Sequence, residues 1–327
     1  GMGGSILGSE AIYCFLKDKI KKNFLFFNNL DETKKYNFNN SKNYLFIIIS
    51  KSGNTLETIT NVNLIKKKIL TSKNTIIISS KNNNALYFYS KKNNIPFVEH
   101  KKYIGGRYSV LSEAGMLPAY LMGLDPRKIR SRILENFNSK KSSFLIDSAS
   151  KLSQIYLSKK INSLVFLNYS PYLNKFLYWC QQLIAESLGK NGKGLLPLIS
   201  VAPKDHHSLL QLYLDGPKDK IFYIFSNKSK INKKVSFNHF DNRFNYIKNK
   251  NFKRIVGAQK KALIDIFRKK NIPFREIELA QSDEKNLGEL FSYFMIETIL
   301  IGKLMNVNPF DQPSVESVKI ITKKYLN

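Results

Sequence analysis

The segment Leu45-Phe46-Ile47-Ile48-Ile49-Ser50-Lys51-Ser52-Gly53-Asn54-Thr55 carries the strongest structural signal in the chain. Its first half is an apolar, β-branched run typical of a buried strand, and its second half is a hydroxyl-rich turn before a helix-competent region. A strand, a short turn and a helix N-terminus in this order expose backbone N–H groups and the positive end of a helix dipole. Three hydroxyls and one ammonium add donors, so residues 50–55 are predicted to bind a phosphate group. A Ser/Thr helix cap with only a local role is the alternative.

Further strand-like runs show that this unit belongs to an α/β fold. They recur at residues 45–49, 75–79, 163–167, 221–226 and 274–279, with helix-length segments between most of them. Such alternation predicts parallel sheets covered by helices. Glycine and proline cluster at 105–126, which places a domain boundary near residue 125 and predicts domains at 1–125 and 126–327. Residues 227–250, rich in Asn, Lys and Ser, are expected to form a surface loop.

Size and composition limit the class of protein. The chain has 327 residues, 43% of them apolar, which is enough to fill two cores. No apolar run approaches the roughly 18–20 residues that span a bilayer, so a cytoplasmic protein without a membrane partner is expected. Cys14 and Cys180 are the only cysteines and lack metal-ligand spacing, so both are expected to be reduced, packed thiols and no metal site is expected.

The formal net charge of +29 would suit a nucleic-acid-binding protein. Only eight of the 53 basic residues are Arg, however, and the lysines are spread along the chain with abundant Asn and Ile. No basic and aromatic module that would organise base contacts is present. We therefore expect no nucleic-acid partner, and note that a positive protein also steers small phosphorylated anions.

Two further segments carry candidate chemical groups. Gly3-Gly4-Ser5 precedes a predicted helix at 6–15, and its glycines either let a ligand approach the backbone or only form a tight turn. Residues 173–188 show the spacing of an amphipathic helix that ends at Gly189. Glu186 lies on the flank of the apolar face and shares its side with Trp179, so it is either a half-buried catalytic base or a solvated flank residue.

Asp205-His206-His207 contains two of the four histidines in the chain. An acid beside paired histidines favours acid/base chemistry here, because no third or fourth metal ligand has the usual spacing. Near the C-terminus, Asp311-Gln312-Pro313 reads as a helix start, and Gln312 and Lys319 are seven residues apart. If the two residues lie on one helix, both side chains would point at one ligand. Taken alone, an exposed Lys on a terminal helix is a solvated residue.

Taken together, these segments resemble the glucose-6-phosphate isomerase family, and the resemblance covers nearly the whole chain. Five blocks occur in family order: GMGGSILG at 1–8, SKSGNTLET at 50–58, GGRYSVLS at 105–112, AESLGKNGKGLLP at 185–197 with DHHSLLQLYLDGP at 205–217, and NPFDQPSVESVK at 308–319. The second block alone would indicate only the wider sugar isomerase (SIS) superfamily of phosphosugar-binding proteins.

The resemblance implies two SIS domains, each with a parallel five-stranded sheet between helices, and a homodimer whose active sites draw on both subunits. It also implies a substrate-binding set, in which residues 50–55, through their hydroxyls and the Lys51 backbone, hold the sugar phosphate and the remaining residues line the sugar. That set is Gly4, Ser5, Ser50, Lys51, Ser52, Thr55 and Gln312.

The resemblance further implies the catalytic groups. Glu186 would move a proton between C2 and C1 of glucose 6-phosphate and fructose 6-phosphate, and Arg107 would stabilise the enediolate. His207 would assist ring opening, donated across the dimer, with Lys319 and Gln312 on the ring-oxygen side. This chemistry needs a base, an acid/base pair and cations, and requires no metal or redox cofactor.

The sequence departs from the family pattern at two points. His206 stands where similar sequences usually have Gln, which leaves the roles of the two histidines open. The family usually has several dozen residues, including a strand, before its first glycine block, so the first domain is expected to be N-terminally incomplete. Two other functions stay open: a non-catalytic SIS-type phosphosugar-binding regulator, which would need no proton-transfer residues, and a dual phosphoglucose/phosphomannose isomerase.

Overall fold

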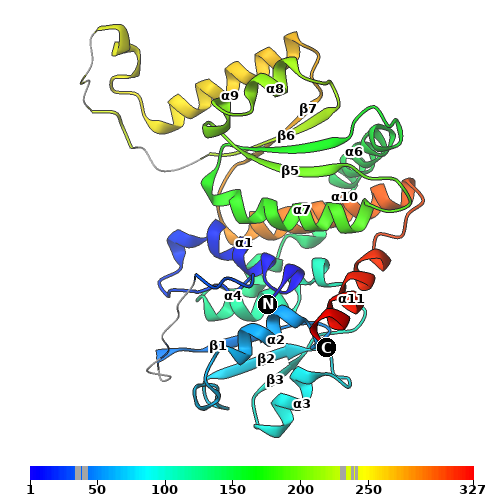
Figure 1. The fold of residues 1–327 in the computed structure, drawn as a ribbon. Coiled ribbons are helices and arrows are strands. Elements are labelled where there is room, and N and C mark those ends of the chain that lie inside the picture. Colours follow the sequence, from blue (N-terminus) through cyan, green and yellow to red (C-terminus); the bar gives the residue numbers. More distant parts are fainter. Residues whose placement is uncertain (34–37, 39–42, 229–232, 237–238, 240–241) are drawn as a thin grey trace.

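The computed structural model describes residues 1–33, 38, 43–228, 233–236, 239 and 242–327 (Figure 1). The described residues contain two parallel sheets, with strand orders β1-β2-β3 and β5-β4-β6-β7. The strands are β1 Phe46–Ile49, β2 Thr75–Ser79, β3 Phe97–Glu99, β4 Ser163–Asn168, β5 Leu196–Val201, β6 Lys220–Asn227 and β7 Phe274–Leu279. The predicted α/β class with parallel sheets is confirmed.

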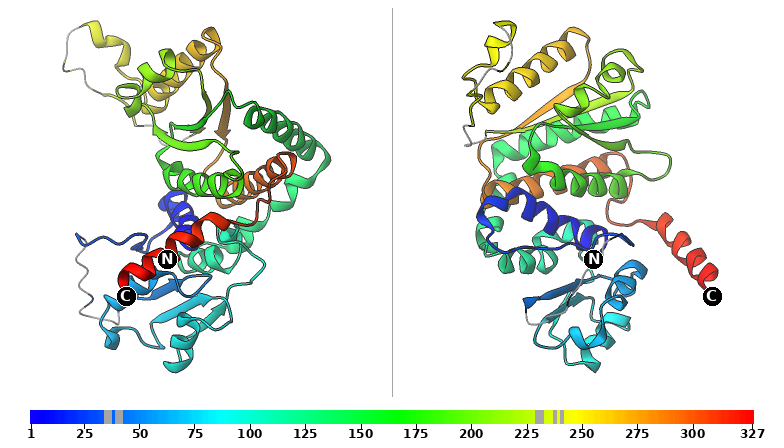
Figure 2. Two further views of the ribbon diagram at one scale, coloured as in Figure 1. Left: turned by 45° about the vertical axis from the view of Figure 1, so that its right-hand side comes forward. Right: turned by 60° about the vertical axis from the view of Figure 1, so that its left-hand side comes forward.

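Helices cover both faces of each sheet (Figures 1 and 2). Their bounds are α1 Leu7–Phe15, α2 Leu56–Asn63, α3 Ala85–Lys92, α4 Glu113–Leu121, α5 Pro126–Arg130, α6 Ser139–Leu157, α7 Asn174–Leu188, α8 Leu210–Asp215, α9 Phe252–Lys269, α10 Glu284–Leu304 and α11 Glu316–Leu326. No helix in the described part of the chain is long and apolar enough to cross a membrane.

The largest core lies between the two sheets. Phe166 of β4 and Phe225 of β6 belong to it, together with Phe176 of α7 and Phe294 of α10. The Phe176 ring centroid lies 6.5 Å from that of Phe225 and 5.8 Å from that of Phe294. The same core includes Ile12 of α1, so the N-terminal helix is anchored on the second sheet's helix layer. This packing fixes α7 against the glycine turn that precedes α1. The predicted boundary near residue 125 falls between the two sheets and stays a prediction.

The sheets contain fewer strands than the five expected for each. Among the described residues the first sheet has three strands and the second has four. Beyond β7 the chain forms α10, and the segment after α10 is held by side chains of other elements instead of pairing with β7. In the first sheet β1 is an edge strand. Residues 229–232, 237–238 and 240–241 of the predicted surface loop lie outside the described residues.

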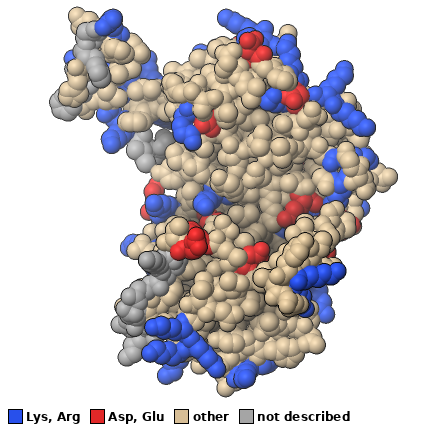
Figure 3. Space-filling view, viewed as in Figure 1, with Lys and Arg blue, Asp and Glu red and all other residues tan. Residues whose placement is uncertain are grey.

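Side-chain charges are distributed over the whole face seen in Figure 3, with Lys and Arg on both halves of the molecule. They do not gather into a single patch on that face. Both cysteines are free thiols; Cys180 is buried in the central core and Cys14 is half-buried. The expectation of packed thiols is confirmed.

Candidate active site

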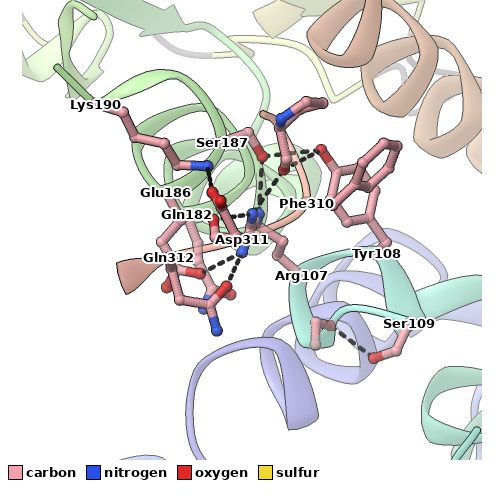
Figure 4. Close-up of polar contacts among 12 residues, drawn as sticks. Arg107, Tyr108, Ser109, Gln182, Glu186, Ser187, Lys190, Phe310, Asp311 and Gln312 are labelled. Atoms are coloured by element: carbon pink, nitrogen blue, oxygen red, sulfur yellow. Dashed lines mark hydrogen bonds and ion pairs between the residues drawn. The ribbon is translucent and has the colours of Figure 1, made fainter. Parts of the chain in front are cut away.

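Glu186 lies in the last turn of α7. The apolar face of α7 is buried in the core, and this packing fixes the position of Glu186. The Glu186 side chain is 32% exposed. Its Oε1 accepts a hydrogen bond from Gln182 Nε2 at 2.9 Å, and its Oε2 lies 3.2 Å from Arg107 Nη1 (Figure 4). The carboxylate is thus oriented by two donors and still reaches solvent. The predicted helix, its C-cap at Gly189 and the half-buried position of Glu186 are confirmed.

Arg107 is the most enclosed charged group of this cluster, with its side chain 1% exposed. It belongs to the 3-10 helix Gly106–Leu111, whose position is fixed because Trp179 Nε1 donates to the Arg107 carbonyl oxygen at 3.2 Å. Arg107 Nε donates to Ser187 Oγ at 2.8 Å, and Nη1 faces Glu186. The guanidinium therefore binds two successive residues of α7.

The remaining donors of Arg107 bind the segment that follows α10. Its Nη2 donates to the carbonyl oxygens of Pro309 at 2.7 Å and Asp311 at 2.9 Å, and Nη1 also donates to Gln312 Oε1. Lys190, just beyond α7, donates to the Asp311 carboxylate at 2.7 Å. These contacts place Gln312 beside Glu186, as Figure 4 shows.

The glycine turn at residues 3–5 closes the cluster from the other side. A Cβ on Gly4 would lie 2.2 Å from the Gly106 carbonyl group, so Gly4 allows the backbone of this turn to touch that of the Gly105–Gly106 loop. Gly3 has φ +51° and lies against Gln182 Nε2, 2.6 Å from where a Cβ would stand. The turn therefore serves close backbone packing next to the Glu186 cluster. Ser5 lines a cavity beside β1, and its expected contact with the sugar stays a prediction.

The predicted phosphate loop forms a compact set of hydroxyls between β1 and α2. Ser50 Oγ lies 2.8 Å from Thr55 Oγ1, and Ser52 Oγ lies 3.2 Å from Thr55 Oγ1. Thr55 precedes the first residue of α2 and does not cap it through its side chain. The first-turn N–H groups of an α-helix have no intrahelical partner, so they add donors at this loop.

Lys51, in the phosphate loop, lies close enough to Arg107 for the two positive charges to interact. Burial lowers the pKa of Lys51, and the nearby positive charge of Arg107 lowers it further. The two cations therefore act on the same region, and an anion bound between them would relieve their repulsion. This arrangement suits a ligand that carries a phosphate at one end and develops negative charge at the other.

Two predicted site residues, Lys319 and His207, are not brought to Glu186 within the described chain. Lys319 is 64% exposed and donates to Glu316 of its own helix at 2.9 Å. The expectation that Gln312 and Lys319 share one helix face is wrong, because α11 begins only at Glu316 and Gln312 lies before it. Gln312 takes its position from Arg107 instead.

The two histidines have different environments. His206 Nε2 lies 2.8 Å from the Tyr169 hydroxyl, and burial, together with His207, lowers the pKa of His206. The His207 residue is exposed. Asp205 accepts from Val201 N at 2.7 Å and Ser200 Oγ at 3.1 Å, so its carboxylate fixes the loop that carries both rings.

Sequence patterns missed three residues that support the cluster. Gln182 lies one helical turn before Glu186, so its i,i+4 spacing could have revealed it. Ser187 and Tyr108 share a hydrogen bond of 2.9 Å, and the Tyr108 hydroxyl also donates to the Pro309 carbonyl oxygen at 3.1 Å. No local signal identifies them, because their partners are 79 and 201 residues away in sequence.

Comparison with known proteins identifies the family. The family model for phosphoglucose isomerase matches residues 1–195. A glucose-6-phosphate isomerase of Methanocaldococcus jannaschii is 34% identical, with 98% of this chain and 82% of that protein covered. The chain belongs to the phosphoglucose isomerase family. A glucose-6-phosphate isomerase of Campylobacter jejuni is 30% identical over 100% of this chain and 84% of its own length.

Solved structures support the phosphoglucose isomerase fold. A hypothetical protein of Thermus thermophilus superimposes with a TM-score of 0.89 at 24% identity, covering 100% of this chain and 82% of the other. A glucose-6-phosphate isomerase of Chlamydia trachomatis gives a TM-score of 0.81 at 19% identity, covering 100% of this chain and 68% of the other. At these identities the likeness concerns the fold alone.

Proposed function

We propose that this chain is an aldose–ketose isomerase that interconverts glucose 6-phosphate and fructose 6-phosphate through a cis-enediolate. The observation that carries the proposal is the half-buried Glu186 carboxylate, which Gln182 and Arg107 orient. Lys51 of the phosphate loop interacts electrostatically with the same Arg107. A phosphosugar-binding regulator needs the loop and has no use for an oriented base. Membership of the phosphoglucose isomerase family supports the same function.

The proposed mechanism begins with binding of the phosphate dianion. Ser50, Ser52 and Thr55 donate hydroxyls, the Lys51 backbone and the first turn of α2 donate N–H groups, and the Lys51 ammonium adds charge. Gly4 and Ser5 line the sugar. Positioned proton transfer contributes only about 10²–10⁴-fold, so holding the sugar in place by its phosphate must supply much of the remaining acceleration.

The proton-transfer step uses Glu186. Its carboxylate removes the C2 proton of open-chain glucose 6-phosphate, and the resulting enediolate is reprotonated at C1 by the same group. Arg107 Nη1 faces the base and also donates to Gln312 Oε1, while Nε and Nη2 bind other protein acceptors. Arg107 therefore stabilises the enediolate oxygen as a charge in a fixed position. Such a charge is efficient in electrostatic catalysis because it does not have to reorganise during the reaction.

Ring opening and the quaternary structure are linked in this proposal. His207 is exposed and makes no contact with the Glu186 cluster of its own described chain, so we assign it to the site of a second copy in a homodimer. Gln312 lies beside Arg107 and would contact the sugar, whereas Lys319 would reach the ring-oxygen side from α11. The exposed apolar residues Val318 and Ile321 of α11 support contact of this helix with another surface.

A test of the base changes Glu186 alone. Glu186→Gln should lower kcat by about 10²–10⁴-fold, because the amide keeps the shape and loses the proton acceptor. KM for fructose 6-phosphate should change little. A coupled isomerase assay measures both, and Glu135→Gln, which removes a surface carboxylate, serves as the matched control. Wild-type turnover in Glu186→Gln would eliminate Glu186 as the base.

The phosphate loop is tested by removing its hydroxyls. Ser52→Ala and Thr55→Ala should each raise KM, with a larger effect for the pair, because a hydrogen bond to a charged group is worth about 1.5–3 kcal/mol. Ser72→Ala, an exposed Ser outside the loop, is the control. Unphosphorylated fructose should be nearly inert. Comparable activity on fructose and fructose 6-phosphate would disprove the assignment of residues 50–55 to phosphate.

A pair of alanine variants separates the histidines. His207→Ala should slow the reaction of the cyclic substrate far more than that of an open-chain analogue, because it removes the ring-opening group. His206→Ala should mainly disturb packing against Tyr169. Steady-state rates of both variants on both substrates decide the assignment. Equal losses, or a larger loss in His206→Ala, would show that the assignment of ring opening to His207 alone is wrong.

A further inference from the structure

A buried histidine lies at the edge of the first sheet that also carries the phosphate loop. His100 directly follows β3, and its backbone N–H donates to the carbonyl oxygen of Ser79, the last residue of β2, at 2.7 Å. Ser80 N in turn donates to the Lys51 carbonyl oxygen at 3.1 Å. His100 and Lys51 therefore lie on either side of the end of β2, at the carboxyl edge where open parallel sheets bind ligands.

The His100 ring is enclosed and only partly hydrogen-bonded. Its side chain is 1% exposed. The ring Nδ1 lies 3.2 Å from the Lys101 carbonyl oxygen, and because a carbonyl oxygen can only accept, the proton of the neutral ring is on Nδ1. The Nε2 atom is buried and has no hydrogen-bond partner among the described residues. Buried polar atoms are nearly always hydrogen-bonded, so this unpaired ring nitrogen needs an explanation.

Glu113 places a carboxylate beside this ring. It is the first residue of α4, and its Oε1 lies 3.7 Å from His100 Nδ1. Glu113 Oε1 is also buried without a hydrogen-bond partner in the described part of the chain. With a neutral ring both groups are incompletely satisfied, whereas a protonated ring forms an ion pair with the carboxylate at this distance. The pair can therefore hold one additional proton.

The charged groups that face the ring come from α4 and from the phosphate loop. Glu113 favours the protonated ring, as does the Lys101 carbonyl oxygen, and Lys51 opposes it. On the segment of His100 itself, Glu99 and Lys101 form an exposed ion pair at 2.9 Å, so their charges largely cancel. Burial, assisted by the charge of Lys51, lowers the pKa of His100 from its ordinary value of 6.5.

An anion bound at the phosphate loop reverses the influence of Lys51. Its negative charge offsets the ammonium charge of Lys51, which is the charge that opposes protonation of His100. The anion and Glu113 then both favour the protonated ring. By linkage, a proton on His100 must strengthen the binding of the anion to the same extent.

We propose that His100, paired with Glu113, is a proton-binding residue of the phosphate site, which takes up a proton when a phosphomonoester dianion binds and strengthens that binding without touching the phosphate. The inference rests on the proposed function, through the assignment of residues 50–55 to phosphate. Because the effect acts through charge, it favours a dianion over a monoanion.

The test uses inorganic sulfate, which keeps two negative charges between about pH 5.5 and pH 7.5, so that the probe itself does not titrate. Isothermal titration calorimetry of the full chain at constant ionic strength, in buffers with different heats of ionisation, gives the affinity and the number of protons taken up. The affinity should rise at least about threefold from the upper to the lower pH, with net uptake of protons.

Three variants assign this uptake to the pair. His100→Gln should lose most of the pH dependence, because an amide is polar and cannot be protonated in this range. Glu113→Gln should also reduce the uptake, because the charged ring loses its carboxylate, and it tests the pair even if His100→Gln does not fold. His239→Gln changes an exposed histidine and is the matched control, so it should behave like the unchanged chain.

Unaltered proton uptake in His100→Gln and Glu113→Gln would overturn the proposal. A double variant, Ser52→Ala with Thr55→Ala, separates this outcome from a failure of the proposed function. Sulfate that binds equally well to the double variant and to the unchanged chain would disprove the phosphate loop, and the role of His100 with it. Sulfate binding that needs the loop but takes up no proton would overturn the role of His100 alone.

Discussion

The buried guanidinium of Arg107 is the interaction on which the candidate site depends. A charge that is 1% exposed is stable only when it is fully paired and hydrogen-bonded, and Arg107 meets this requirement with acceptors from two distant parts of the chain. Ser187 is 80 residues away and Gln312 is 205 residues away in sequence. By satisfying its own donors, Arg107 fixes the end of α7, the segment after α10 and the glycine loop relative to each other.

This constraint explains how a strongly basic protein organises a small site from a few groups with fixed positions. The net charge of +29 resides mostly on solvated lysines, which set a general attraction for anions. Local specificity comes from the few groups with fixed positions. Arg107 orients Glu186, Lys51 lies in the field of Arg107, and Ser50, Ser52 and Thr55 hold their hydroxyls together. A phosphosugar fits this division, with its phosphate at the loop and its reacting carbons at the carboxylate.

Local sequence patterns predicted the elements that carry their own signal, such as the β-branched runs of β1, β2, β4, β6 and β7 and the apolar face of α7. The missed strands have weak patterns, because β3 has three residues and β5 contains Pro197. Residue type and spacing singled out residues 50–55 and Glu186 as candidates, and the family motifs supplied the role of each residue. Spacing failed for Gln312 and Lys319, because a turn precedes α11. The supporting contacts of Ser187 and Tyr108 span 79 and 201 residues, which no local pattern contains.

If Glu186, held by Arg107, transfers a proton between C2 and C1 of a phosphosugar in D2O, deuterium is incorporated at both carbons. NMR of glucose 6-phosphate and fructose 6-phosphate incubated with the chain in D2O measures this incorporation. We expect deuterium to enter at C2 of glucose 6-phosphate and C1 of fructose 6-phosphate, and at no other carbon, as the two sugars equilibrate. Binding of glucose 6-phosphate with full retention of hydrogen at C2, and no formation of fructose 6-phosphate, would contradict this mechanism.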